Sequence, residues 1–222
     1  SIMPCTAKKF ESQRPEMNSS GFRDVDLVLT TREVGKLFRM GGAYWDKLEP
    51  SNFDSLLGAY TGAGVIFGAS GGVMEAALRT VYEVVTGQTL EDVNFTGVRG
   101  FDSMKEAEVD LSGTKVKVAV ANSLGAARKI MDEIKAGTSP YHFIEVMCCP
   151  GGCIGGGGQP IPSTIAKKKE RIAAIYVEDE GLPLRKSHDN PEVKKLYEDF
   201  LKEPLGHKSH ELLHTHYHPS GK

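Results

Sequence analysis

Residues 114–153, TKVKVAVANSLGAARKIMDEIKAGTSPYHFIEVMCCPGGC, decide the predicted fold. Lys115 to Ala121 alternates polar and apolar residues and predicts a strand. Ala126 to Lys135 has helical spacing with Gly137 as its stop, and His142 to Met147 predicts a second strand. Two strands joined through a helix form a parallel unit. The stretch therefore predicts an α/β protein with helices flanking parallel or mixed sheets.

The second strand runs directly into CCPGGCIGGGGQP, residues 148–160. Open α/β sheets bind their ligands beyond the carboxyl ends of the strands. We therefore expect this cysteine and glycine loop to lie at the sheet edge where a functional site belongs.

Working outward from this unit, the patterns predict further elements. Residues 106–120 form two alternating runs around Ser112-Gly113, which is typical of a hairpin. Residues 73–87 have helical spacing and end on Gly87, and the glycine-rich residues 61–72 before them indicate backbone packed closely against a neighbour.

Toward the N-terminus, residues 25–29 predict a strand, and Thr30 with Glu33 predicts a capping box that opens a helix to about Met40. Residues 45–60 predict a loop with short helical turns. Near the C-terminus, a helix is expected to begin at Asn190-Pro191, and a shorter one in residues 207–219.

Composition excludes several classes of protein. The 222 residues carry 27 Lys plus Arg against 29 Asp plus Glu, so no overall field favours nucleic acid or an anionic membrane. The sequence has no long apolar run and no basic leader, so we expect no membrane span and a cytoplasmic location. The opening residues SIMPC are unlike a natural start, which suggests that the chain is part of a larger unit.

The four cysteines are Cys5, Cys148, Cys149 and Cys153. Disulfides do not suit a long chain with few cysteines. Zinc usually takes C-x2-4-C knuckles, and one C-x3-C set among glycines and far from a single upstream cysteine is not the usual knuckle. Inert thiols need no surrounding glycines, and this chain has no Gly-Lys-Ser/Thr after the glycines, as a phosphate loop would. These uses remain alternatives. Small residues around thiolates suit an iron-sulfur cluster best, because its sulfides accept backbone N–H hydrogen bonds.

Two longer motifs are more specific. MPCTAKKFE (residues 3–11) and EVMCCPGGCIGGGGQP (residues 145–160) resemble the second and third signature motifs, MPCxxKxxE and ExMxCxxGCxxGGGQP, of the iron-only (FeFe) hydrogenases. Further stretches resemble this family in the same order, so the resemblance covers essentially all of residues 1–222. It identifies the chain as the C-terminal portion of the two-lobed catalytic domain.

The resemblance implies a cofactor and its ligands. In this family a [4Fe–4S] cubane is bridged by one cysteine to a diiron unit with carbon monoxide, cyanide and a dithiolate bridge. Cys5 and Cys149 match cubane ligands, and Cys153 matches the bridging cysteine. The fourth ligand belongs to a first motif, TSCCPxW, which this chain lacks, as it lacks accessory iron-sulfur domains. The implied partners are the TSCCP-bearing remainder of the domain and an electron carrier, either ferredoxin or nicotinamide-linked subunits.

The resemblance also assigns residues around the cofactor. Lys8 would donate to a cyanide ligand, and Met3, Met147 and Phe67 with Gly68 would lie beside the diiron unit. Glu11 and Glu145 are expected to be structural and to satisfy loop backbone.

Three remaining features have ordinary explanations. We interpret Cys148 as a buried small hydrophobic residue, since adjacent residues of an extended segment point in opposite directions. The C-terminal histidines, although spaced at i and i+4 on a predicted helix, are interpreted as structural. The basic stretch AKKKER (residues 166–171) is a solvated helix face.

The implied activity is reversible oxidation of dihydrogen. Two alternatives remain, an iron-sulfur assembly protein without a diiron unit and a hydrogen sensor.

Overall fold

The computed structural model describes residues 1–54 and 57–219. The chain divides into two compact units. The first comprises Ser1–Ala59, Gly157–Ile161 and Pro191–Lys222, and the second comprises Tyr60–Gly156 and Pro162–Asn190. Within the described ranges, no helix has the length and apolar character needed to cross a membrane. The architecture is a mixed α/β fold with small sheets flanked by helices, as predicted.

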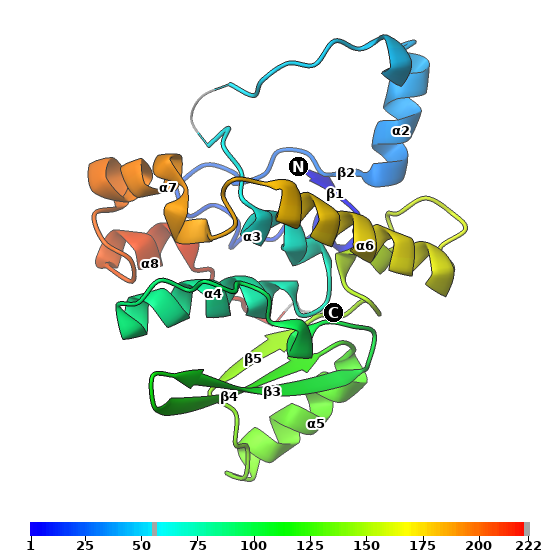
Figure 1. Ribbon diagram of the computed structural model, residues 1–222. Helices are drawn as coiled ribbons and strands as arrows, with labels where there is room; N and C mark the ends of the chain where they lie inside the picture. Colours follow the sequence, from blue (N-terminus) through cyan, green and yellow to red (C-terminus); the bar gives the residue numbers. More distant parts are fainter. Residues whose placement is uncertain (55–56, 220–222) are drawn as a thin grey trace. The chain divides into compact units, whose positions relative to one another are not determined.

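The second unit is built on a three-stranded sheet in the order β3-β4-β5 (Figure 1). Strands β3 (Met104–Leu111) and β4 (Thr114–Ala121) form the predicted antiparallel hairpin, and Ser112 and Gly113 both have positive φ in its turn. Helix α5 (Leu124–Lys135) then leads to β5 (Phe143–Val146), which pairs parallel with β4. The predicted strand-helix-strand unit is confirmed.

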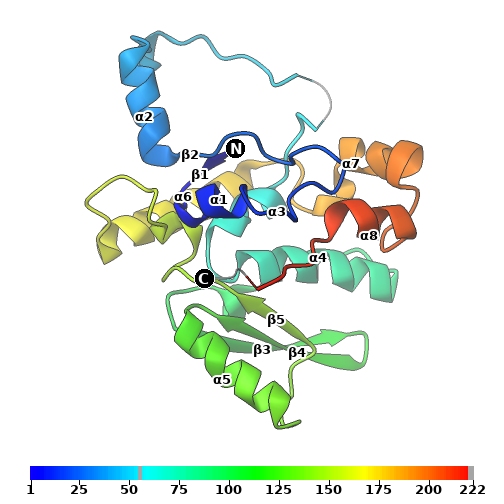
Figure 2. The same ribbon diagram turned by 180° about the vertical axis from the view of Figure 1, so that it is seen from behind.

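Successive side chains of β4 point to opposite faces of the sheet and contribute to two separate cores. Val118 and Val120 pack with Met74 and Leu78 of α4 (Gly72–Thr86), while Ala119 and Ala121 pack with α5 on the other face. Figures 1 and 2 show α4 and α5 on opposite sides of this sheet. Small alanines thus face α5, and larger valines face α4. Helix α4 has the predicted Gly87 end, with Gly87 at φ +65°.

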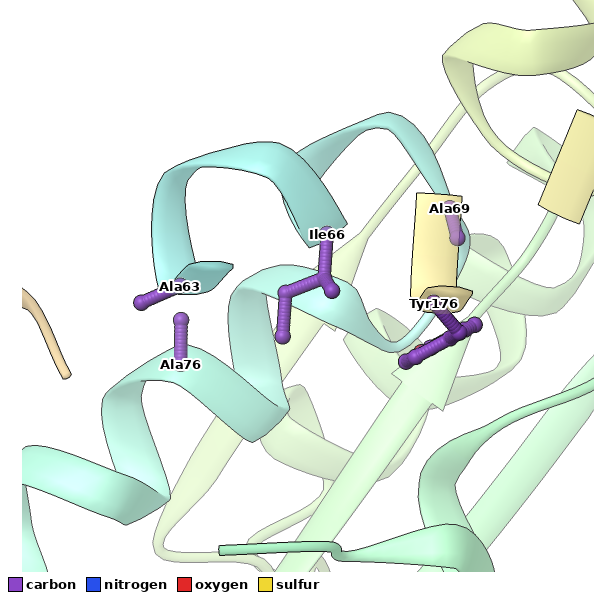
Figure 3. Packing of buried hydrophobic residues seen from close by; sticks show 5 residues of the cluster. All are labelled: Ala63, Ile66, Ala69, Ala76 and Tyr176. Atoms are coloured by element: carbon purple, nitrogen blue, oxygen red, sulfur yellow. The ribbon is translucent and has the colours of Figure 1, made fainter. Parts of the chain in front are cut away.

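A third cluster joins α3 (Gly62–Val65) and the following 3-10 turn Ile66–Gly68 to α4 and to α6 (Ile165–Gly181). Figure 3 shows how Ile66 points toward this cluster, whose members are Ala63, Ile66, Ala69, Ala76 and Tyr176. The 3-10 turns Thr96–Val98, Cys153–Gly155 and Ser187–Asp189 complete this unit.

A buried ion network lies next to the same helices. Arg79 is fully buried and donates to both carboxylate oxygens of Asp179, at 2.7 and 2.8 Å, and to Glu75 at 2.8 Å. Arg99 also pairs with Glu75, and Arg185 with Asp179. Burial alone would lower the pKa of Arg79, but its hydrogen bonds to Asp179 and Glu75 raise it. The network ties α4 to α6 through paired charges.

The first unit holds the N-terminal motif. Strands β1 (Ile2–Met3) and β2 (Leu29–Thr30) pair in parallel, and α1 (Ala7–Glu11) follows β1. Helix α2 (Thr31–Met40) begins with the predicted capping box, in which Glu33 N donates to Thr30 Oγ1 and Glu33 Oε2 accepts from Thr30 N. Residues 45–54 are loop except for the 3-10 turn Trp45–Lys47, while residues 55 and 56 of the predicted loop lie outside the described residues.

Two predictions for this unit need correction. The strand predicted at residues 25–29 is wrong for residues 25–28, because pairing with the two-residue strand β1 starts only at Leu29. The C-terminal helices are α7 (Pro191–Leu196) with a π turn at Tyr197–Leu201, and α8 (His207–Leu213). His214 is the extended C-cap of α8, so His214 and His218 do not share a helix face.

Candidate metal centre

Cys149 and Cys153 bracket a turn of Pro150, Gly151 and Gly152. Gly152 N donates to Cys149 O at 2.9 Å, and Gly156 N donates to Cys153 O at 2.9 Å. Gly151 and Gly152 have φ of +87° and +94°, a left-handed conformation that side chains disfavour. Both cysteines are half-buried. The loop follows β5 at the carboxyl end of the sheet, as predicted.

Neither glycine has room for a side chain. A Cβ at Gly152 would lie 2.5 Å from Ser70 N and 2.7 Å from Ala69 C, and one at Gly151 would lie 2.6 Å from the Phe101 ring. The clash at Gly152 involves backbone, which cannot move without disturbing the start of α4. The turn is therefore restricted to glycine by packing as well as by its dihedral angles.

Hydrogen bonds hold this turn from two sides. Ser70 N donates to Gly151 O at 3.1 Å, and Gly151 N donates to Asn122 Oδ1 at 3.1 Å. Lys105 in turn donates to both Ser70 O and Ser70 Oγ at 3.0 Å. No sequence pattern indicated Ser70, Asn122 or Lys105 as supporting residues. Asn122 follows the end of β4, and a polar residue at the carboxyl end of a parallel strand could have indicated it.

Glu145 has the structural role predicted for it. It is 5% exposed and accepts from Gly71 N and Met74 N, both at 2.7 Å. Its carboxylate therefore satisfies N–H groups at the start of α4 and complements the positive end of the helix dipole. Through this contact the strand that leads to the cysteine loop is fixed to α4.

Three other residues of this unit were predicted to lie near the cofactor, namely Phe67, Gly68 and Met147. A Cβ at Gly152 would lie 2.9 Å from Gly68 O, so the turn that carries Phe67 and Gly68 packs on the cysteine loop. Phe67 remains 46% exposed. Met147 is half-buried and donates its backbone N–H to Ala121 O at 2.8 Å.

The interpretation of Cys148 as a buried hydrophobic residue is wrong, because its side chain is exposed. Val146 and Cys148 are exposed while Glu145 is buried and Met147 and Cys149 are half-buried, so exposure alternates along this extended segment. The expectation that Cys148 and Cys149 differ in direction agrees with this alternation.

The first unit contains Met3, Cys5 and Lys8. Gly158 N donates to Pro4 O at 3.0 Å, and a Cβ at Gly158 would lie 2.9 Å from Cys5 N. The backbone that carries half-buried Cys5 thus lies directly against the GGQP segment of the other motif. A cavity of about 250 Å³ is lined by Met3, Lys8 and Glu11 with Ser1, Ser12, Met17, Val25 and Val28.

Lys8 forms an ion pair with Glu11, one helical turn along α1. Burial lowers the pKa of Lys8, but the hydrogen bond and charge of Glu11 outweigh this effect and raise it overall. Glu11 also accepts from Tyr217 Oη at 3.0 Å. These partners are side chains, so the contacts of Glu11 do not support the prediction that it satisfies loop backbone.

The donor set fits a thiolate-bound cluster. Soft thiolates select iron-sulfur clusters, zinc or copper(I), and the small residues of the Gly151–Gly152 turn leave space for bulky inorganic sulfide. The second unit brings together Cys149, Cys153, Met147, Phe67 and Gly68. The first unit contributes Cys5, Met3 and Lys8.

Residues 1–157 match the family model described as the C-terminal domain of the iron-only hydrogenase large subunit. The chain belongs to the iron-only hydrogenase family. Residues 165–220 match a second model, the iron hydrogenase small subunit. The iron-only hydrogenase match thus continues from the cysteine motifs through α6 to α8.

Individual relatives agree with this family. The chain is 51% identical over 98% of its length to the NADP-reducing hydrogenase subunit HndD of Solidesulfovibrio fructosivorans, and it covers 37% of that protein. It is 52% identical over 77% of its length to the periplasmic [Fe] hydrogenase large subunit of Nitratidesulfovibrio vulgaris, and it covers 41% of that protein. The cytoplasmic location therefore stays a prediction.

Solved structures and more distant relatives extend the comparison. The structure of [FeFe]-hydrogenase HydA1 from Chlamydomonas reinhardtii, in a variant form, matches with a TM-score of 0.77 and 42% identity over 98% of this chain and 62% of that one. Protein NAR1 of Arabidopsis thaliana is 34% identical over 98% of this chain and 49% of its own length. The chain thus spans less than two thirds of each of these proteins.

Proposed function

We propose that this chain supplies most of the protein ligands of a [4Fe–4S] cubane and diiron cofactor that oxidises dihydrogen reversibly. Cys5 and Cys149 would be cubane ligands, and Cys153 would bridge the cubane to the diiron unit. When bound, the cofactor supplies the redox and hydrogen-activating chemistry. The remaining protein contribution is to hold, orient and shield it.

One observation carries this proposal, namely the turn of Pro150, Gly151 and Gly152 between two half-buried cysteines. Gly151 and Gly152 both have positive φ and neither accommodates a Cβ. Inert thiols need no such surroundings, whereas a bulky cluster needs space free of side chains beside its thiolate ligands. The turn is also held at Gly151 by Ser70 and Asn122. Such support from a second layer of residues orients metal ligands in general.

Chain connectivity also supports the ligand set. Cys153 and Gly158 are five residues apart, a span of at most about 18 Å for an extended chain. Gly158 N binds Pro4 O, next to Cys5. The covalent chain alone therefore limits how far the proposed ligands can lie from one another.

Lys8 and Met3 have roles that follow from their chemistry. The ammonium of Lys8 is paired with Glu11 and its pKa is raised, so it remains a charged donor at neutral pH. A charged donor suits the nitrogen of a cyanide ligand. Met3 lines the same cavity, and Met147 and Phe67 would shield the cofactor from water with apolar surface.

The proposal includes a partner segment, the TSCCP-bearing remainder of the catalytic domain, which would supply the fourth ligand. Its support is apolar surface on the first unit, where Leu37, Met40, Trp45 and Phe53 are 55%, 74%, 70% and 79% exposed. Large apolar side chains seldom gather on a free surface. The electron acceptor would be ferredoxin or a nicotinamide-linked subunit.

The test is infrared spectroscopy of the complete protein, meaning this chain together with the rest of its catalytic domain. Wild type is expected to give carbonyl and cyanide bands, and Cys153→Ala is expected to lose them together with hydrogen turnover. Cys148→Ala is the matched control, because Cys148 is the exposed neighbour. Unchanged bands and full turnover in Cys153→Ala would contradict the assignment.

A second candidate function is iron-sulfur assembly without a diiron unit. It is favoured by the 32% identity to cytosolic iron-sulfur assembly component 3 of Rattus norvegicus over 98% of this chain. Lys8 and the methionines argue against it, since a cubane alone offers no cyanide to bind. A wild-type protein that contains a cubane but has no carbonyl or cyanide bands would establish this alternative.

A further inference from the structure

Lys105 on β3 is a buried lysine that the proposed mechanism does not use. It is 6% exposed. Its Nζ donates three hydrogen bonds of 3.0 Å, to Ser70 O, Ser70 Oγ and Gly100 O. All three ammonium donors are therefore satisfied. The three acceptors are neutral, so the positive charge is not cancelled by the groups that it touches.

The contacts of Lys105 lead directly to the cysteine turn. Ser70 N donates to Gly151 O at 3.1 Å, and the same nitrogen would lie 2.5 Å from a Cβ at Gly152. Ser70 is itself 1% exposed. One buried residue thus separates the ammonium from the turn between Cys149 and Cys153.

A buried charge needs a reason, because an apolar side chain of similar length would avoid its desolvation. Burial lowers the pKa of Lys105 to about 8, although the charges of Glu145 and Asp102 oppose this effect. Glu145 faces it from β5, and Asp102 from the segment before β3. The lysine is thus still mainly charged at neutral pH.

A cluster held by thiolates carries negative charge, and its reduction adds more. Net charge and the surrounding dielectric set the reduction potential of such clusters. A positive charge behind the ligand turn stabilises the reduced state more than the oxidised one, and its effect is strong in a buried environment.

We propose that Lys105 is a positioning residue for the cluster, whose fixed charge behind the Gly151–Gly152 turn raises the reduction potential of the cubane. This inference rests on the proposed function, because it requires a cluster at Cys149 and Cys153.

The experiment is a redox titration of the cubane, followed by electron paramagnetic resonance in the complete, cluster-loaded protein. Lys105→Met removes the charge and keeps the length of the side chain. Ser70→Ala removes one neutral acceptor and leaves the charge. Lys115→Met removes an exposed lysine from the neighbouring strand β4 and serves as the surface control.

The reduction potential is expected to become more negative in Lys105→Met and to stay at the wild-type value in Ser70→Ala and Lys115→Met. The wild-type potential is also expected to fall between pH 7 and pH 9 more steeply than that of Lys105→Met. Equal potentials in wild type and Lys105→Met would overturn the inference. So would equal shifts in Lys105→Met and Ser70→Ala, which would indicate displacement of the turn instead of loss of charge.

If Lys105→Met does not fold, the wild-type protein decides. A potential that falls between pH 7 and pH 9 supports the inference, and a constant potential overturns it. A wild type that holds no cluster refutes the proposed function and this inference together. A normal cluster whose potential ignores Lys105 refutes the inference alone.

Discussion

The buried network around Arg79 makes a sharp prediction for Asp179→Asn. Asp179 is fully buried and accepts from Arg79 at 2.7 and 2.8 Å and from Arg185 at 2.6 Å. The network holds three arginines, Arg79, Arg99 and Arg185, against two carboxylates, Glu75 and Asp179. Removing one carboxylate leaves three positive charges and one negative. The substituted amide also points an N–H group at a guanidinium.

Breaking a buried pair by neutralising one partner costs about 3–5 kcal/mol, because the other charge is left uncompensated. The assay is thermal and urea unfolding of the complete protein, followed by circular dichroism. The exposed neighbour on α6, in the variant Glu180→Gln, should change the free energy of unfolding by less than about 0.5 kcal/mol.

The pH dependence gives a second check on the same variant. Burial raises the pKa of Asp179, but hydrogen bonds from Arg79 and Arg185 lower it overall. Its contribution to stability is therefore present above the unfolded pKa of about 4 and is lost as the pH falls through the folded value. The difference between wild type and Asp179→Asn should shrink in acid. A loss below about 1 kcal/mol at pH 7 would refute the assigned role of the network.

Three further variants test the site. Glu145→Gln places an amide N–H against backbone donors at the start of α4 and should lower the free energy of unfolding by about 1.5–3 kcal/mol in urea titration. The added Cβ of Gly152→Ala would lie 2.5 Å from backbone, so this variant should lower the free energy of unfolding by more than about 2 kcal/mol. The control Gly125→Ala, on α5, should be neutral or stabilising. Equal melting temperatures of the two variants would contradict the packing described for Gly152. The pKa of Lys105 is about 8 in the folded state and about 10.5 in the unfolded state. The free energy of unfolding of wild type should therefore rise by about 2–3 kcal/mol from pH 8 to pH 10 relative to Lys105→Met. Parallel curves of stability against pH for the two proteins would exclude this titration.

Local patterns predicted the centre of the fold well. Alternation along β4, the Ser112-Gly113 turn and the Thr30 capping box all depend on residues near one another in the sequence, and all three are confirmed. The strand predicted at residues 25–29 failed for a non-local reason. Alternation there is genuine, but pairing is limited by the two residues that β1 offers.

The site was predicted only where a motif spans it. The motifs marked Cys5, Cys149 and Cys153, and the glycines between the last two indicated a close backbone approach. Ser70, Lys105 and Asn122 reach the cysteine turn from three distant segments, so no local pattern revealed them. The exposure of Cys148 was missed because a small residue in an apolar strand was assumed to be buried on either face.

The central claim is that Cys5, Cys149 and Cys153 hold a cubane cluster. Its most direct test is the iron and acid-labile sulfide content of the complete protein after anaerobic reconstitution, compared among Cys149→Ser, Cys5→Ser and Cys148→Ser. The account predicts that the first two variants lose the cubane and that Cys148→Ser keeps it at the wild-type level. A cubane retained in full by Cys149→Ser, or lost in Cys148→Ser, would contradict it.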